Sequence, residues 1–326
     1  MHWRFIEKLT NYEKPKRNYD ITMKKNNPYK GVIVPMISPL KDDLTVDQEA
    51  VKWIVGNFLN YNVAPFIAGT TGEASSLSFQ QKKDLVEATV EVAKGKAVVY
   101  AGISSNCLPE SIEMAKCFAD MGADVVVANV PSYYPLTDAQ AARFCEQLAD
   151  ASPGPLIFYN ITATTGYSIS LEIIEKLSYH PNVVGLKDSE RDEKRLDQAL
   201  DLWRDREDFV HLIGWAAMSG YALKNGSDGI VPSTGNFTPK LYADLYANAL
   251  NGNWEQVDEL QQLTNNLGAL YQKGRTLGES LAALKVIMDE QGLCGTQVMP
   301  PLYRMENGAE ADYRKEVKSF LSNLNL

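Results

Sequence analysis

The chain has 326 residues, 45% of them hydrophobic and 22% charged, with a formal net charge of −9 at pH 7. The acidic balance argues against a nucleic-acid partner, which would favour a basic surface. No apolar stretch is long enough to span a bilayer, so we expect no membrane partner. The four cysteines are widely spread and the three histidines lack metal-ligand spacing, which predicts a cytoplasmic protein with reduced thiols and no metal site.

Residues 1–30 differ from the rest of the chain, since they hold eight lysines and arginines against three acidic residues. The segment could be a basic docking arm, but its composition is more typical of a solvated tail. We predict a basic, poorly ordered N-terminal extension here and assign it no function.

From residue 31 onward, short β-rich runs alternate with amphipathic stretches. The expected strands are residues 31–37, 65–68, 97–101, 124–128, 155–159, 182–187, 209–213 and 228–231. Helical periodicity is visible at residues 47–59, 79–93, 109–121 and 138–150. Eight such units predict an α/β fold, a (β/α)8 TIM barrel. A doubly wound sheet is the alternative, but it favours a glycine-rich loop after the first strand, where this chain has Pro35-Met36-Ile37-Ser38-Pro39.

The pattern changes after the barrel. Residues 253–270, 277–291 and 309–324 are predicted to be helical, with no strand between them. We therefore expect three parts: the extension at residues 1–30, the barrel at residues 31–250, and a C-terminal helical domain at residues 251–326.

Lys187 follows the sixth apolar run, residues 182–186, and is an unusual residue at the end of a buried strand. Burial would lower its pKa and expose a neutral amine that can form a Schiff base with a carbonyl compound. Taken alone, the simpler interpretation is a side chain that reaches solvent or pairs with Asp188.

Catalytic groups of such barrels lie at the carboxyl ends of the strands. Four of the predicted strands end in unusual groups: Gly69-Thr70-Thr71-Gly72-Glu73, Pro131-Ser132-Tyr133-Tyr134-Pro135, Tyr159-Asn160 and Lys187. The first segment is either a turn or an anion cradle, and the tyrosines of the second are either packing aromatics or site residues. Tyr159 either fills the core or passes protons. Because separate segments converge on one face, we favour the functional interpretation.

Residues 69–73, Tyr159-Asn160 with Gly166, and residues 184–189 together resemble the dihydrodipicolinate synthase/N-acetylneuraminate lyase family. The resemblance runs in order from about residue 30 to the C-terminus. It implies a class I, metal-independent, pyruvate-dependent aldolase or lyase that works through a covalent imine without a cofactor. It also implies a homotetramer, and a small-molecule partner that is pyruvate or another 2-oxo acid.

The same resemblance implies roles for individual residues. Lys187 matches the lysine that forms the imine, and Tyr159 matches the tyrosine that shuttles protons and orients it. Thr70 and Thr71 match the pair that holds the carboxylate of the 2-oxo acid. Tyr133 matches a proton-relay tyrosine that in some members reaches into the site of a neighbouring subunit.

Three positions depart from the family pattern. Dihydrodipicolinate synthases usually carry an arginine five residues after the tyrosine, to bind the carboxylate of the aldehyde, where this chain has Thr164. Threonine cannot replace a bidentate guanidinium. Sialic-acid lyases usually carry an acidic pair after the seventh strand, where this chain has Gly214-Trp215-Ala216-Ala217. Thr162 replaces the usual proline of the Tyr-Asn motif. The two best-known substrates of the family are therefore disfavoured.

We expect a Schiff-base aldolase or lyase that joins or cleaves pyruvate and an aldehyde, acting on a 2-keto-3-deoxy sugar acid or a related 2-oxo acid. The alternatives are a sugar-acid dehydratase using the same imine, dihydrodipicolinate synthase proper, and a non-catalytic relative that binds 2-oxo acids. Trp215 would form an apolar wall for the distal end of the substrate. The expected catalytic residues are Lys187, Tyr159, Tyr133 and Thr71, and the expected substrate contacts are Thr70, Thr71, Gly72, Thr164, Ser189, Trp215 and Ser233.

Overall fold

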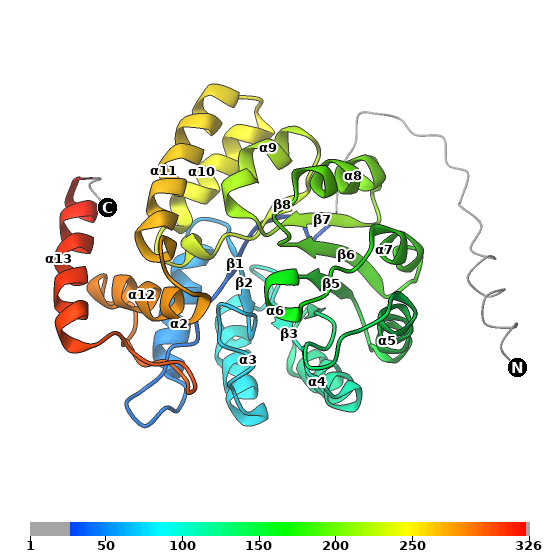
Figure 1. The fold of residues 1–326 in the computed structure, drawn as a ribbon, viewed down its shortest axis with the longest axis horizontal. Coiled ribbons are helices and arrows are strands. Elements are labelled where there is room, and N and C mark those ends of the chain that lie inside the picture. Colours follow the sequence, from blue (N-terminus) through cyan, green and yellow to red (C-terminus); the bar gives the residue numbers. More distant parts are fainter. Residues whose placement is uncertain (1–26, 324–326) are drawn as a thin grey trace, which may run out of the picture.

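The computed structural model describes residues 27–323, so most of the expected N-terminal extension lies outside the described part of the chain. The strands are β1 (Gly31–Pro35), β2 (Ala64–Ile67), β3 (Tyr100–Gly102), β4 (Val125–Ala128), β5 (Leu156–Asn160), β6 (Val183–Asp188), β7 (Val210–Ile213) and β8 (Gly229–Ile230). Each strand is parallel to the next, and β8 pairs with β1 to close the barrel in sequence order. The predicted (β/α)8 barrel is confirmed (Figure 1).

Helices surround the strands on the outside of the barrel, except for the short α6 (Thr162–Thr165), which lies over the middle of the barrel beside β5 (Figure 1). The surrounding helices are α2 (Gln48–Leu59), α3 (Phe79–Ala93), α4 (Leu108–Met121), α5 (Asp138–Ala151), α7 (Leu171–Leu177), α8 (Glu193–Trp203), α9 (Ser219–Lys224) and α10 (Pro239–Leu250). Two 3₁₀ segments, η1 (Ala216–Met218) and η2 (Ser233–Asn236), follow β7 and β8. Within residues 27–323, no helix combines the length and apolar character needed to cross a membrane.

Side-chain caps explain where several helices begin. The carboxylate of Asp47 accepts a backbone N–H from the first turn of α2. Ser78 forms a capping box with Gln81 at α3, and Thr137 forms one with Gln140 at α5. The four helices expected before β5 are confirmed to within one residue at each end.

Five strands, β1, β3, β4, β7 and β8, are shorter than predicted. In β1 and β3, backbone groups near one end bond to side chains instead of neighbouring strands. The N–H of Val99 donates to the carboxylate of Asp124 at 2.8 Å, and β3 begins only at Tyr100. The N–H of Ile37 donates to the side-chain oxygen of Asn236 at 2.9 Å, beyond the end of β1. The predicted bounds were therefore wrong at the C-terminal end of β1, which was expected at residues 31–37, and at the N-terminal end of β3, which was expected at residues 97–101.

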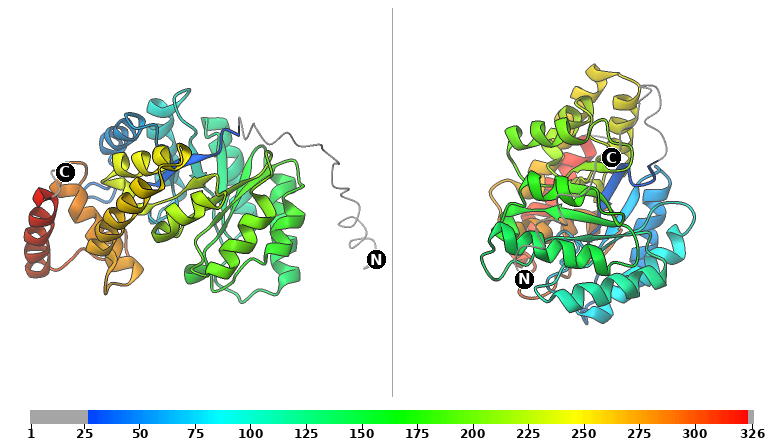
Figure 2. Two further views of the ribbon diagram at one scale, coloured as in Figure 1. Left: turned by 90° about the horizontal axis from the view of Figure 1, so that it is seen from above. Right: turned by 90° about the vertical axis from the view of Figure 1, so that its right-hand side faces the viewer.

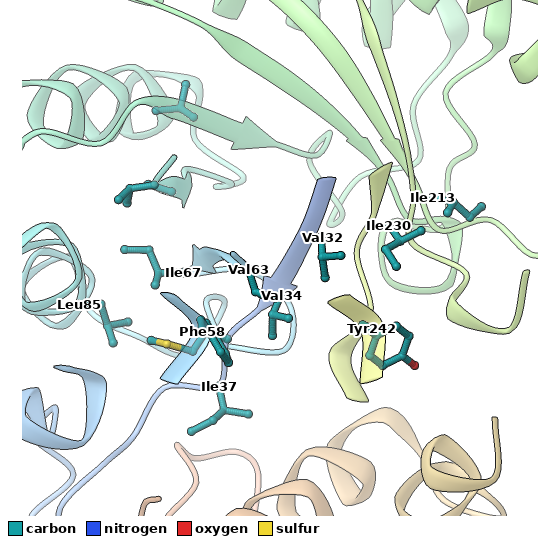
Figure 3. Packing of buried hydrophobic residues seen from close by; sticks show 14 of the residues in the cluster. Val32, Val34, Ile37, Phe58, Val63, Ile67, Leu85, Ile213, Ile230 and Tyr242 are labelled. Atoms are coloured by element: carbon teal, nitrogen blue, oxygen red, sulfur yellow. The ribbon is translucent and has the colours of Figure 1, made fainter. Parts of the chain in front are cut away.

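Two apolar cores follow from the alternation of side chains along the strands. In β1, Ile33 belongs to a cluster inside the barrel, whereas Val32 and Val34 belong to the outer core that packs against the helices. Figure 3 shows the outer core near β1, where Phe58 and Ile67 lie close to Val34. Because both faces are buried, the strands appear in the sequence as continuous apolar runs.

Three helices follow the barrel: α11 (Trp254–Gln272), α12 (Leu277–Glu290) and α13 (Asn307–Asn323). α11 packs on α10, and α12 packs on both α11 and α13. In Figures 1 and 2, α13 lies at the edge of the molecule, away from the strands. Every residue of α12 from Ser280 to Met288 is buried, so this helix is enclosed on all sides. The predicted C-terminal helical appendage is confirmed, and α12 is its buried part.

Candidate active site

Lys187 lies inside the barrel. It lies near the end of β6, in register with Tyr159 of β5 across the parallel pair. Only 4% of the residue is exposed, so the interpretation of Lys187 as a lysine that reaches solvent is wrong. Desolvation disfavours the charged ammonium and lowers the pKa of Lys187 to about 7. A neutral, nucleophilic amine is therefore available near neutral pH.

The amine has aromatic rather than ionic neighbours. Lys187 Nζ lies 3.6 Å from the ring centroid of Tyr159 and 4.8 Å from that of Phe66. Among residues 27–323 it has no acidic partner; Asp188 pairs with Arg195 instead, with 2.7 Å between Oδ2 and Nε. Adjacent residues of a strand point to opposite faces, which separates this carboxylate from the amine. No acidic side chain in the described surroundings offsets the desolvation of Lys187.

Tyr159 is also buried, and two neighbours hold its hydroxyl. Ser189 Oγ donates to the hydroxyl oxygen across 3.4 Å, and Thr70 of the loop after β2 hydrogen-bonds the same phenol. Burial raises the pKa of Tyr159, and the charge of Asp188 adds to this, while the two hydrogen bonds oppose it. The phenol therefore stays protonated at neutral pH and can donate a proton inside the barrel.

The loop of residues 69–73 is tightly constrained. A Cβ added to Gly72 would lie 2.9 Å from the backbone oxygen of Met36, so only glycine fits without a shift. Ala68, just before the loop, and Glu73, its last residue, have φ angles of +51° and +58°, a strained conformation for residues that carry a side chain. Backbone strain of this kind is typical of ligand-binding loops.

A cleft of about 230 Å³ opens beside this loop. Its polar lining comes from the loops after β2 to β5 and includes Thr70, Ser75, Ser104, Asn106, Asn129 and Thr164. Leu277 and Leu281 of α12 form part of the apolar lining. Among the described residues that line the cleft, the only charged one is Glu73, and its carboxylate is fully buried. Lys187 and Tyr159 do not line the cleft themselves, but Thr70, which does, bonds Tyr159, and the Tyr159 ring contacts Lys187.

The turn that carries Thr164 is organised by Glu190, a residue that no sequence motif singles out. Glu190 Oε2 accepts hydrogen bonds from Asn160 at 2.8 Å, Thr162 at 2.9 Å and Ser168 at 2.6 Å. Thr162, the first residue of α6, therefore bonds to the loop after β6 through its hydroxyl. The family usually has proline at this position, which could not make this bond. A single acidic residue in a loop forms no sequence motif. The role of Glu190 can therefore be identified only from the folded structure.

Of the ten expected site residues, only Thr70 and Thr164 line the cleft. The other eight do not: Lys187, Tyr159, Thr71, Gly72, Ser189, Tyr133, Ser233 and Trp215. Tyr133 is 76% exposed and packs edge-on against Tyr134, with 4.9 Å between the ring centroids. Ser233 Oγ lies 2.7 Å from the hydroxyl of Tyr271, and Trp215 packs half-buried against the outer core. Their roles stay predictions. Within the described part of the chain, no cluster of three or more histidine, cysteine or acidic residues could hold a metal ion.

Comparison with known sequences gives one consistent family. The model of the dihydrodipicolinate synthetase family matches residues 28–323. The 4-hydroxy-tetrahydrodipicolinate synthase of Halorhodospira halophila is 28% identical over 296 residues, which cover 89% of this chain and 96% of that protein. An uncharacterised DapA-like lyase of Pyrococcus furiosus is 30% identical over 275 residues, which cover 84% and 91% of the two chains.

Solved structures agree with the sequence comparison. The dihydrodipicolinate synthase of Bacteroides thetaiotaomicron has a TM-score of 0.84 and 29% identity, and the match covers 90% of this chain and 100% of that chain. The Acinetobacter baumannii enzyme, whose structure is complexed with pyruvate, has a TM-score of 0.81 and 26% identity over 90% and 98% of the two chains. The chain therefore belongs to the dihydrodipicolinate synthetase family, and it is an enzyme of the class I, pyruvate-dependent aldolase and lyase type.

Proposed function

We propose that this enzyme joins or cleaves pyruvate and an aldehyde, with a 2-keto-3-deoxy sugar acid or a related 2-oxo acid as its substrate. The observation that carries the proposal is the buried amine of Lys187, which faces Tyr159 and has no acidic partner among residues 27–323. Burying such an amine opposes folding, and chemistry that needs a neutral nucleophile explains its presence. The pyruvate complex of the Acinetobacter baumannii relative supports a 2-oxo acid as ligand.

Cleavage proceeds through an imine on Lys187. The neutral amine attacks the C2 carbonyl carbon, and loss of water leaves a protonated imine. Tyr159 gives its proton to the departing water, and the resulting phenolate takes the proton of the C4 hydroxyl. The C3–C4 bond then breaks and its electron pair moves into the imine, which releases the aldehyde and leaves an enamine. Protonation at C3 and hydrolysis then release pyruvate and the free amine. Tyr159, held by Ser189 and Thr70, transfers the protons, and no cofactor takes part.

The loop after β2 would hold the carboxylate of the 2-oxo acid. Thr70 lines the cleft and contacts Tyr159, and Thr71 is buried beside it. Their hydroxyls and the backbone N–H of Thr71 are suitable donors for an anion. A carboxylate fixed at this point would place C2 near the amine that faces Tyr159, which would lower the entropic part of the barrier.

The distal part of the substrate would be neutral and rich in hydroxyl groups. The cleft offers side-chain hydroxyls and amides, with Thr164 in the position where dihydrodipicolinate synthases usually carry arginine. A second carboxylate would leave water for this cleft without gaining a cationic partner, which is unfavourable. Sugar hydroxyls can instead exchange hydrogen bonds with Ser104, Asn106 and Asn129.

We further propose a cytoplasmic homotetramer. Tyr133 and Tyr134 expose two aromatic rings next to the cleft residue Ser132, and exposed aromatic residues of this kind are typical of protein interfaces. A neighbouring subunit would cover them, and Tyr133 would then join the proton relay. All four cysteines are free, as expected in a reducing compartment.

A turnover panel tests the substrate. Pyruvate is incubated with neutral hydroxyaldehydes and, separately, with an aldehyde that carries a carboxylate, and the products are identified by mass spectrometry. We expect carbon–carbon bond formation with the neutral aldehydes only, and Thr164→Arg should gain activity with the carboxylated one. Condensation restricted to the carboxylated aldehyde would instead support dihydrodipicolinate synthase proper.

The same panel, run with 2-keto-3-deoxy acids, distinguishes cleavage from dehydration and from binding without turnover. Cleavage releases pyruvate and an aldehyde, as we expect. Loss of water without pyruvate would show a dehydratase, since the same imine permits elimination. Thermal stabilisation by 2-oxo acids without any product would show a binding protein.

A further inference from the structure

Glu73 and Lys285 form an ion pair that is completely enclosed in protein. Lys285 Nζ lies 2.6 Å from Glu73 Oε1, and both side chains are 0% exposed. Lys285 also donates to the backbone oxygen of Gln297 at 2.5 Å, and Glu73 Oε2 accepts the backbone N–H of Met299 at 2.6 Å. Both carboxylate oxygens are therefore held from the C-terminal helical region, by α12 and by the segment that follows it.

Glu73 is the last residue of the loop that would hold the substrate carboxylate. Its own N–H donates to the backbone oxygen of Thr70 at 3.1 Å, and its φ angle of +58° is one that few side-chain-bearing residues adopt. At the preceding residue, Ser38 Oγ donates to the backbone oxygen of Gly72 at 2.6 Å. The loop is thus fixed from the barrel at Gly72 and from α12 at Glu73.

We propose, on the basis of the function proposed above, that Lys285 is a positioning residue for the carboxylate site: α12 fixes the loop of residues 69–73 through the Glu73–Lys285 pair. Taking two charges out of water is expensive, and an apolar pair of similar volume would often stabilise a core at least as well. Stability alone is therefore a poor reason for this pair. Its value lies in fixing one loop conformation, because Thr70 must meet both the ligand and Tyr159.

Lys285→Met tests this inference in the full-length protein. The measured quantity is the pyruvate concentration that gives half-maximal borohydride-trapped adduct, recorded at a temperature where the variant is folded. We expect this concentration to rise roughly tenfold or more, because small misplacements of binding groups have large effects. The pH dependence of trapping should stay as in the wild type, since Lys187 is not in the ion pair.

Arg314→Met is the matched control. Arg314 of α13 forms ion pairs with Asp289 and Glu290 at the end of α12 but does not contact the loop. Its loss should lower the melting temperature without changing the half-saturating pyruvate concentration. A similar rise in both variants would show that general loosening of the helical region is the cause, and would overturn the inference.

The double variant Glu73→Gln/Lys285→Met separates positioning from folding. It removes both charges, so it should regain thermal stability relative to Lys285→Met, yet the link to α12 stays broken and pyruvate should still bind weakly. If Lys285→Met does not fold, the double variant alone tests the positioning role of Lys285. Wild-type half-saturation in either folded variant contradicts the positioning role, whereas failure of the wild-type protein to trap pyruvate would refute the proposed function itself.

Discussion

Two of the buried lysines, Lys187 in the barrel and Lys285 in the C-terminal helices, have opposite surroundings. Lys187 Nζ faces the rings of Tyr159 and Phe66 inside the barrel. Lys285 Nζ, on α12, meets a carboxylate and a backbone oxygen. Burial is therefore not sufficient to make a nucleophile. Lys285, whose charge is matched, holds structure, whereas Lys187, which no acidic residue among the described ones matches and which faces Tyr159, is suited to covalent chemistry.

The largest effect that this contrast predicts is the loss of activity in Lys187→Met. Without the amine no imine forms, so kcat should fall by roughly 10³-fold or more, as for other lost nucleophiles. Steady-state assays of pyruvate release would measure it. Lys82→Met is a control, because Lys82 is also a buried lysine whose pKa desolvation lowers, but it lies on α3 beside Met114. An equal loss of activity in both variants would contradict the assignment of Lys187 as the nucleophile.

Tyr159→Phe should have the next largest effect. Removing a proton-transfer group typically lowers the rate by about 10²- to 10⁴-fold, and the ring that packs on Lys187 remains. Single-turnover kinetics should locate the loss in the chemical step. Tyr100→Phe is the matched control, since Tyr100 belongs to the same inner cluster of the barrel. A Tyr159→Phe rate within twofold of wild type would exclude Tyr159 as proton donor.

Stability should respond to the two lysines with opposite sign. Lys285→Met leaves the carboxylate of Glu73 buried without its partner, and the free energy of unfolding should fall by about 3–5 kcal/mol. Lys187→Met should raise the free energy of unfolding, because the substitution removes an amine whose burial is unfavourable. Urea titrations at neutral pH measure both changes. Changes of the same sign would mean that the two surroundings differ less than the contacts indicate.

The gain from Lys187→Met should depend on pH. The pKa of Lys187 is lowered from 10.5 to about 7 on folding, so between these values the unfolded chain binds the extra proton. The destabilisation by Lys187 is fully present below about pH 7 and disappears as the pH rises toward 10.5. The difference in unfolding free energy between variant and wild type should follow this curve, and a difference constant from pH 6 to 10 would contradict the lowered pKa.

The smallest effect concerns the rate of imine formation as the pH changes. Below a pKa of about 7 the neutral fraction of the amine falls about tenfold per pH unit, so the initial trapping rate should fall likewise and level off above pH 7. Circular dichroism at each pH confirms that the protein stays folded. A rate that still rises steeply above pH 9 would indicate an ordinary lysine.

Much of the barrel was predictable, because a strand buried on both faces leaves a continuous apolar run in the sequence. The face of the site was predictable as well, since the ends of β2, β5 and β6 carry residues that do not suit a core. By contrast, α6 has only four residues, three of them threonine, and shows no periodicity. No local pattern indicates its position.

The supporting contacts were not predictable. Glu73 and Lys285 each resemble an ordinary surface charge in sequence, and they meet only because α12 is enclosed by its neighbours. Glu190 gains its role from three donors that lie between the end of β5 and the start of α7. Such pairings depend on tertiary packing, which a single sequence does not encode in any short segment.

The most direct test of the central claim is to reduce the purified protein with borohydride in the presence of pyruvate and to map the adduct by peptide mass spectrometry. One reduced pyruvyl group should be found per chain, on Lys187, and none should form on Lys187→Met. No adduct on the wild-type protein, or an adduct on another lysine such as Lys285, would contradict the account.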